Sequence, residues 1–247
     1  MNKRDEILEG RFEKAMTLMH SGKFENSMQI FDAIYQERPD SKLAARALFH
    51  QGEILNKSLG RYQEALVSYL QLLKQYPHSD MALASQRRVA EIYKYRFQDN
   101  PAAIVAYQNL LDMGTPDRAE GLYEIADSYF KLNNFEQARI EFERFLEKHP
   151  DSGKTAEVTY RIGVCLYIEG ELKDSEDALQ GVIETWPNDP FSVEARFTLG
   201  KVLEEQERLK ESLRIFEGLR GSYSNQVALE KKITQVKDRI KKKKKAI

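Results

Sequence analysis

Residues 125–150 of the 247-residue chain read IADSYFKLNNFEQARIEFERFLEKHP, and this stretch decides the fold. Apolar residues recur at spacings of three and four on both sides of Asn133-Asn134, which predicts two helices joined by a short turn. Small side chains stand at Ala126 and Ala138, twelve positions apart. Two helices approach closely only where neither carries a bulky side chain, so this pair marks the contact inside a helical hairpin.

The same pattern recurs along the rest of the chain. Prolines end five successive segments at intervals of 38, 39, 34 and 37 residues, which is typical of a repeat array: Pro39, Pro77, Pro116, Pro150 and Pro187. The first small position of each hairpin is occupied by Ala15, Gly52, Ala90, Ala126, Gly163 and Gly200. The second small position, 12 or 13 residues later, is occupied by Ser27, Ala65, Ala103, Ala138, Ser175 and Ser212.

Large apolar residues flank these crossings with helical periodicity. Four positions after the second small residue come Phe31, Tyr69, Tyr107, Phe142, Leu179 and Phe216. Three positions further on come Ile34, Leu72, Leu110, Phe145, Val182 and Leu219. One hairpin cannot bury such a face alone, whereas stacked hairpins bury it continuously. No sustained alternation of period two is present, so the sequence predicts an all-α protein.

These residues resemble the tetratricopeptide repeat (TPR) family. The match is nearly complete at Ala126, Tyr129, Phe135, Ala138, Phe142 and Pro150. The resemblance covers about residues 5–224 and implies a right-handed superhelical solenoid of six helix-turn-helix repeats: 5–39, 41–77, 81–116, 117–150, 153–187 and 190–224. Repeat endings at residues 76–79 and 149–152 look most like the bacterial cell-envelope branch of BamD-type and YbgF-type proteins.

The segment 225–247 fits no repeat. Residues 225–240 keep a helical pattern, so we expect one further helix that caps the last repeat. A lysine run, expected to lie frayed beyond that helix, follows: Lys241, Lys242, Lys243, Lys244 and Lys245. Residues 230–247 carry a net charge of +7 and the rest of the chain −8. The run suits an acidic protein surface or an anionic lipid, or is a solubilising end without further function.

The amino-acid composition excludes several classes of protein. The chain is 41% hydrophobic and 31% charged, with no run near the ~20 apolar residues needed to cross a bilayer. No secretory signal opens it, so a cytoplasmic location is expected; a periplasmic or membrane-associated one is the alternative if a leader was removed. The acidic body argues against nucleic acid as the main ligand. One cysteine, Cys165, excludes an intrachain disulfide.

No motif for catalysis, metal or cofactor binding stands out. Gly153-Lys154-Thr155 resembles the end of a phosphate-binding loop, but Lys148 occupies the place of the required first glycine. We interpret the segment as a helix start capped by Asp151 or Ser152. The four histidines lie in different repeats without metal-ligand spacing. The sequence therefore predicts neither an enzyme nor a small-molecule substrate, and no metal or cofactor.

Residues that the hairpin cores do not need are the candidates for binding. The family resemblance implies that the first helices line a concave groove. The residue three positions before each first small residue then points into this groove. Aromatic rings at these positions are suited to binding a peptide. The predicted groove residues are Phe12, Met16, Met19, Arg46, Phe49, Arg87, Lys94, Tyr95, Tyr123, Phe130, Tyr160, Tyr167 and Phe197. The same rings could equally pack between neighbouring first helices.

The sequence thus indicates a non-catalytic scaffold or adaptor that binds a peptide or helical segment of a partner protein. The family resemblance implies a place in a bacterial multiprotein complex. The alternatives are an envelope assembly factor without its leader, a regulatory repeat module, or a self-assembling one.

Overall fold

A computed structural model describes residues 3–245, and these residues form helices joined by short turns, without a strand. The all-α class predicted from the sequence is confirmed. The chain divides into two compact units, an N-terminal unit of residues 1–121 and a C-terminal unit of residues 122–247, which are described separately.

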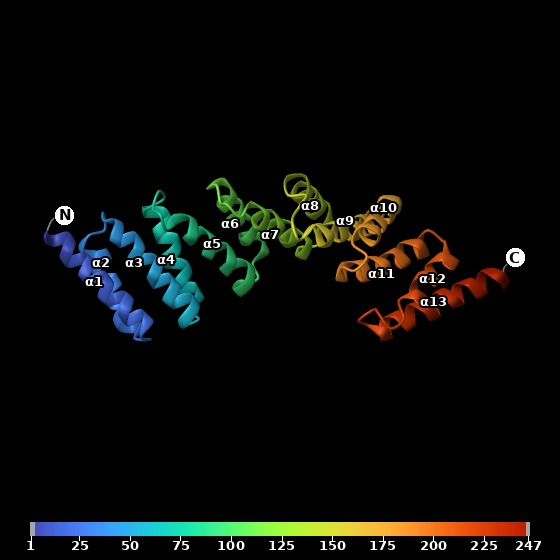
Figure 1. Ribbon diagram of the computed structural model, residues 1–247, viewed down its shortest axis with the longest axis horizontal. Helices are drawn as coiled ribbons and strands as arrows, with labels where there is room; N and C mark the ends of the chain where they lie inside the picture. The colour runs from blue at the N-terminus through green and yellow to red at the C-terminus, as the bar shows by residue number, and fades with distance from the viewer. Residues whose placement is uncertain (1–2, 246–247) are drawn as a thin grey trace. The chain divides into compact units, whose positions relative to one another are not determined.

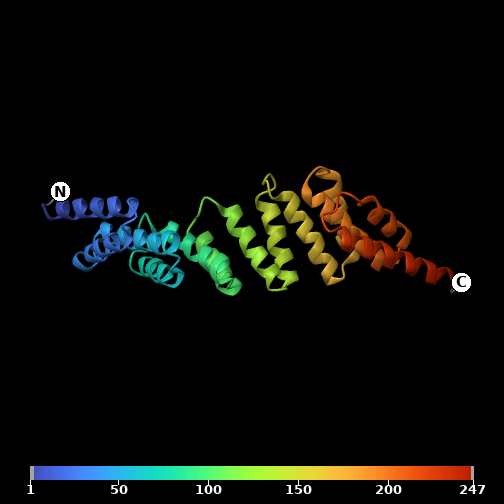
Figure 2. The same cartoon turned by 90° about the horizontal axis from the view of Figure 1, so that it is seen from below.

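Both units are built from helices that pack against their neighbours in the chain (Figures 1 and 2). The N-terminal unit contains α1 (Lys3–His20), α2 (Phe24–Glu37), α3 (Lys42–Glu53), η1 (Ile54–Ser58), α4 (Tyr62–Gln75), α5 (Ala82–Glu91), η2 (Ile92–Phe97) and α6 (Asn100–Asp112). Helix α7 (Arg118–Lys131) begins in that unit and ends in the next. The C-terminal unit continues with α8 (Phe135–Lys148), α9 (Thr155–Glu169), α10 (Leu172–Thr185), α11 (Pro190–Glu205), α12 (Leu209–Gly218) and α13 (Gln226–Lys245).

Short polar side chains start several of these helices. The carboxylate of Asp99 accepts a hydrogen bond from the backbone N–H of Ala102, with a proline in the first turn of α6. Ser41 caps α3 in the same way. Helix α9 differs from the prediction: Lys154 is its N-cap residue and no side chain caps it, so the expected cap at Asp151 or Ser152 was wrong.

The predicted contact inside each hairpin is confirmed at the small positions. A Cβ atom on Gly52 would lie 2.6 Å from the ring of Tyr69, and one on Gly200 would lie 2.6 Å from the ring of Phe216. The twelve large residues predicted from the second helices are all buried. The core therefore runs between the paired helices, as the periodicity indicated.

Serine at the second small position adds a hydrogen bond that the sequence pattern did not reveal. The hydroxyl groups of Ser27, Ser175 and Ser212 each donate to the backbone carbonyl of the facing small residue, with an O···O distance of 2.7 Å. These carbonyls belong to Ala15, Gly163 and Gly200. The hydroxyl thus ties the second helix to the first at the point of closest approach.

Replacing Ser175 by alanine should destabilise the C-terminal unit by about 1 kcal/mol, because a buried hydroxyl–carbonyl hydrogen bond is lost. The midpoint of urea unfolding measures this change. Ala138 occupies the equivalent position in α8, so the opposite change can be made there. Ala138→Ser should not lower the midpoint. Equal stability of Ser175→Ala and the parent chain would show that this bond contributes nothing.

Two hairpins contain a π-helical turn, and the spacing of their small residues explains it. The small residues stand 13 apart in the pairs Gly52/Ala65 and Ala90/Ala103, where η1 and η2 occur, and 12 apart in the other four hairpins. The wider turn absorbs the extra residue. Leu59 N–H accordingly bonds to the carbonyl of Ile54, five residues back, and Ile54 stays in the core.

Helix α13 lies in the segment where a capping helix was expected, and it covers the apolar end of the last hairpin. Figures 1 and 2 show it beside α12. Leu229, Ile233 and Val236 of α13 pack in one cluster with Phe216 and Leu219. The helix continues to Lys245, so the expectation that it ends at Ile240 was wrong. Lysine near a helix C-terminus interacts favourably with the helix dipole, and Lys243 also binds Glu207, with an N···O distance of 2.5 Å.

Candidate functional site

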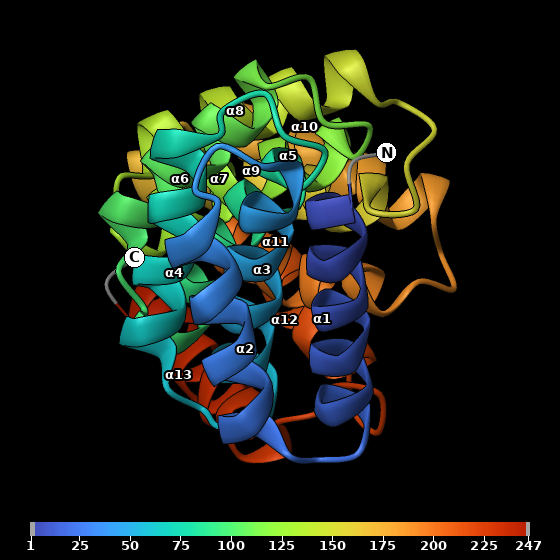
Figure 3. The same ribbon diagram turned by 90° about the vertical axis from the view of Figure 1, so that its left-hand side faces the viewer.

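The surface on which a partner was expected consists of the first helices of the hairpins, and we call it the first-helix surface. In the N-terminal unit it comprises α1, α3 with η1, and α5 with η2. Figure 3 looks at this unit from its N-terminal end, with α1 and α2 in front of α3 and α4. In the C-terminal unit the surface comprises the end of α7 with α9 and α11.

Phe12 is a core residue, contrary to the prediction that it lines a groove. Its side chain is 3% exposed, and its ring centroid lies 5.4 Å from that of Phe31 and 5.7 Å from that of His50. The guanidinium of Arg46 lies 4.5 Å from the Phe12 centroid and covers it further. Phe49 is half-buried against His50 and Tyr69. A ring so enclosed offers little contact area to a partner.

The basic residues predicted for this unit are largely engaged within it. Arg87 binds the carboxylates of Asp117 at 2.5 Å and Glu120 at 2.9 Å. Lys94 is 3% exposed, so it does not present its charge on the surface. Met16 and Met19 are half-buried on α1. Arg87 and Lys94 were predicted to line the groove, but Arg87 is paired within the unit and Lys94 is buried, so neither presents its charge to a partner.

Carboxylate–arginine pairs join successive first helices, and the sequence analysis missed them. Glu53 accepts from Arg88 at 2.8 Å, and Asp127 accepts from Arg161 at 3.2 Å. Both pairs use the same register: the acid follows a small position by one residue, and the arginine precedes the next small position by two. Opposite charges at these paired positions were the signal that could have revealed them.

The environment of Glu53 keeps it ionised. Burial raises the pKa of Glu53, but hydrogen bonds from Lys57, Tyr69 and Arg88 outweigh burial, so that its pKa lies below the usual value. Arg88 also binds Glu91 at 2.7 Å. These groups form a polar network that fixes α3 relative to α5.

Tyr95 is the aromatic residue that the first-helix surface of the N-terminal unit exposes most, at 53%. It lies on η2 at a small pocket of about 150 Å³. The pocket is lined by Asn56, Glu91, Ile92, Tyr95, Arg96 and Glu120. The two π-helical segments thus contribute Asn56 and Tyr95 to one depression, with carboxylates at its edge.

Tyr123 is buried in the C-terminal unit, and the prediction that it lines a groove was wrong. It is 7% exposed, and its hydroxyl donates to Glu157 at 2.5 Å. The ammonium of Lys154 lies 3.9 Å from its ring centroid. Burial, and then the hydrogen bond to Glu157, raises the pKa of Tyr123. Residues of α9 and of the turn before it cover this ring, which the periodicity within one helix could not show.

The other predicted rings of this unit are half-buried and have partners. Phe130 packs edge-on against Phe135 with centroids 5.3 Å apart, and Tyr160 packs against Phe191 at 5.6 Å. Phe197 is stacked on Tyr223 at 4.2 Å, which removes one face of the ring from the surface.

Tyr167 presents its edge beside charged groups. Its hydroxyl donates to Glu205 at 2.5 Å, and the ammonium of Lys201 lies 4.5 Å from the ring. Both neighbours belong to the next first helix, α11. Tyr167 therefore links α9 to α11 and leaves only part of its ring for a partner.

Sequence models of the tetratricopeptide repeat match two parts of the chain. One model matches residues 46–79 and another matches residues 92–153 and 123–190, together more than half of the chain. The chain is a tetratricopeptide repeat protein. Proteins of this family are generally protein-interaction scaffolds, and the repeat fold is typically non-catalytic. A comparison with curated protein sequences found no match.

Solved structures with the same fold include other TPR proteins. YrrB, described as a TPR protein with an unusual peptide-binding site, is 18% identical with a TM-score of 0.61, and the alignment covers 82% of this chain and 97% of that one. A tetratricopeptide repeat protein from Parabacteroides merdae is 20% identical with a TM-score of 0.57, covering 93% and 98%. A chain from the structure of Naa15/Naa10 bound to HypK-THB is 15% identical with a TM-score of 0.60, covering 97% and 35%.

Neither an activated thiol nor a metal-binding cluster is found in the part of this TPR protein that the structure describes. Burial raises the pKa of the Cys165 thiol to about 12, so it is not poised as a thiolate nucleophile. Residues 3–245 contain no cluster of three metal-ligating side chains. Within the same residues, no helix is both long and apolar enough for a transmembrane span.

The lysines at the end of α13 are mostly exposed. Lys241, Lys242 and Lys244 are exposed, while Lys243 binds Glu207. The side chain of Lys245 lies outside the described residues. Two further cations of α13, Lys232 and Arg239, bind the buried Glu204 of α11, both at 2.9 Å. The basic character of this helix therefore serves partly to dock it and partly remains available on its last turn.

Proposed function

We propose that this protein is a non-catalytic scaffold that binds a peptide or helical segment of a partner protein on its first-helix surface. The observation that carries this proposal is the exposed ring of Tyr95 beside the pocket between η1 and η2. A rigid aromatic side chain supplies large contact area at a low entropic cost, and the neighbouring Asn56 and Glu91 offer hydrogen-bonding groups. The family role as interaction scaffolds supports the proposal.

The part of the predicted groove that we retain is smaller than the sequence suggested. We propose Tyr95 as the anchor and the exposed part of Tyr167 as a second contact in the C-terminal unit. The half-buried Met16, Met19 and Phe49 would widen the contact around the anchor if the partner follows α1 and α3.

The setting that we propose is a bacterial multiprotein complex. The resemblance of the endings at residues 76–79 and 149–152 to BamD-type and YbgF-type proteins supports it. Anionic lipid or an acidic protein surface at the lysine run is an additional contact that such a setting would supply.

Replacing Tyr95 by alanine should raise the Kd of a bound peptide more than about tenfold, because the central ring of the contact is removed. Peptides selected from a displayed random library against the full chain supply the ligand, and fluorescence anisotropy measures its Kd. Val105→Ala is the matched control, since Val105 is 61% exposed but lies on the second helix α6. Selected peptides that bind both variants with the Kd of the parent chain would contradict the proposed surface.

A further inference from the structure

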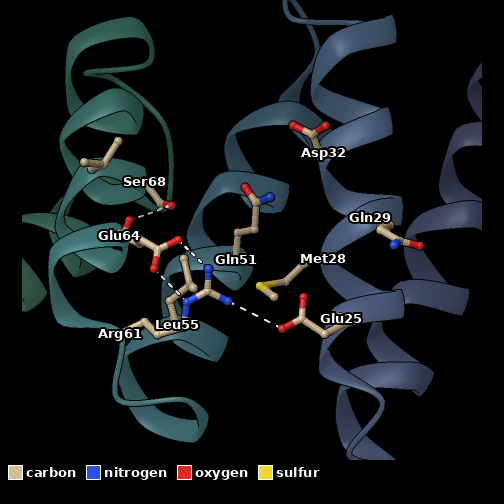
Figure 4. A pocket seen from close by; sticks show the side chains of 10 residues that line it. Glu25, Met28, Gln29, Asp32, Gln51, Leu55, Arg61, Glu64 and Ser68 are labelled. Carbon is tan, nitrogen blue, oxygen red and sulfur yellow. Dashed lines mark hydrogen bonds and ion pairs between the residues drawn. The ribbon is translucent and has the colours of Figure 1, made fainter.

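A cleft of about 430 Å³ lies between the second helices α2 and α4 of the N-terminal unit, with Gln51 of α3 and Leu55 of η1 also in its lining (Figure 4). Its floor includes the side chains of Met28 and Leu55, which are only 9% and 6% exposed, while Val67 of α4, 63% exposed, borders it and is the apolar side chain that water reaches most. The cleft therefore combines an open mouth with apolar surface that water covers in the isolated chain. Surface of this kind gains free energy when an apolar stem covers it.

The rim of this cleft is acidic. Glu25 and Asp32 come from α2 and Glu64 from α4, against one cation, Arg61. Arg61 binds Glu64 with both nitrogen–oxygen distances below 3 Å and reaches Glu25 at 3.4 Å (Figure 4). The side chain of Asp32 is exposed and makes no hydrogen bond or ion pair within residues 3–245. An excess of carboxylate thus borders the apolar floor.

The last turn of α13 has the complementary chemistry. Lys241, Lys242 and Lys244 are exposed, and none of them has an ion-pair partner among the described residues. Lys241 and Lys244 stand three positions apart and so share a face of the helix. A lysine side chain covers apolar surface with its methylene stem while its ammonium group reaches a carboxylate at the edge. The exposed Val67 beside the acidic rim suits such a side chain.

We propose that the cleft between α2 and α4 binds the lysine-rich end of α13 from a second copy of this chain. The two surfaces lie in different units of one chain, and neither includes Tyr95, the proposed anchor for the peptide. Because the contact joins unlike surfaces, a pair of copies keeps one free cleft on one copy and one free basic helix end on the other. Further copies add at these free surfaces until the copies close into a ring, so the mean mass grows with concentration.

Sedimentation velocity of the full chain over two decades of concentration tests this contact. Asp32→Lys alters the cleft, and the triple change Lys241→Glu, Lys242→Glu and Lys244→Glu alters the helix end. Each should raise the apparent Kd of self-association about tenfold, because repulsion replaces attraction. Higher salt should also weaken the parent chain's association, since it screens exposed charges.

Mixing and a matched control make the test specific. The Asp32→Lys chain keeps an intact helix end and the triple variant keeps an intact cleft, so mixing the two should restore association. Glu9→Lys makes the same charge change at an exposed position of α1 outside the cleft and should associate like the parent. Thermal melts followed by circular dichroism confirm that each variant folds.

Three outcomes would overturn the proposal. A parent chain that stays monomeric at every concentration excludes self-association. Loss of association in the triple variant alone, with Asp32→Lys unaffected, places the basic end on a different surface. Association that Glu9→Lys weakens as much as Asp32→Lys reflects net charge instead of the cleft. None of these three outcomes bears on peptide binding at Tyr95. The self-association proposal can therefore fail while the scaffold proposal holds, and the two experiments distinguish these cases.

Discussion

Replacing Gly163 by leucine should destabilise the C-terminal unit by about 1 to 3 kcal/mol through overpacking. A Cβ atom at this position would lie 2.8 Å from both Cγ and Cδ2 of Leu179, so even the first added carbon requires the Leu179 side chain or helix α10 to shift. The urea midpoint should fall accordingly, because the surface exposed on unfolding changes little.

Gly181 of α10 supplies the matched control for this prediction. It also lies within a helix, but a Cβ atom there would meet no other atom within 4 Å. Gly181→Leu should therefore leave the stability unchanged or raise it by up to about 1 kcal/mol, because leucine favours the helix more than glycine does. Equal midpoints for the two leucine variants would show that α9 and α10 do not cross at Gly163.

Replacing Tyr123 by alanine should destabilise the same unit by about 3 kcal/mol, as expected for truncation of a buried aromatic ring. The ring packs against Phe142 and Phe145 with centroids 6.2 and 6.4 Å away. The change also leaves Glu157 without the hydroxyl that donates to it. Urea unfolding followed by circular dichroism measures the loss.

Tyr123→Phe separates the ring from its hydroxyl group. This variant keeps the packing and loses one hydrogen bond to a charged group, so a cost of about 1 to 2 kcal/mol is expected. If Tyr123→Ala instead kept the parent midpoint and lost peptide binding, the ring would belong to the binding surface, as the sequence alone suggested.

One physical difference explains why the core residues were predicted correctly and the groove residues were not. Gly163 and Leu179 belong to helices that are adjacent in the chain, so their contact follows from the helical period and a short turn. The exposure of a ring on a first helix depends on the next hairpin. Tyr123 is covered by Lys154 and Glu157, which lie more than thirty residues later and follow no local rule.

The π-helical turns could be predicted only in part from the sequence. The spacing of 13 residues between Gly52 and Ala65 was visible in the sequence, yet an insertion can be absorbed in the turn or in either helix. The structure places it at the end of the first helix, where η1 and η2 bring Asn56 and Tyr95 to one pocket. The candidate anchor of the site thus arises from an irregularity in the repeat.

The sequence by itself determined the all-α class, the family, the small residues at each helix crossing and the large residues beside them. These features depend on side-chain size at fixed helical intervals, which neighbouring residues in the chain dictate. Only the tertiary structure decided which aromatic rings stay exposed, which charges are paired across repeats, and how far α13 continues. Those properties depend on side chains brought together from separate repeats, because burial and ion pairing are set by distance in space and not by distance along the chain.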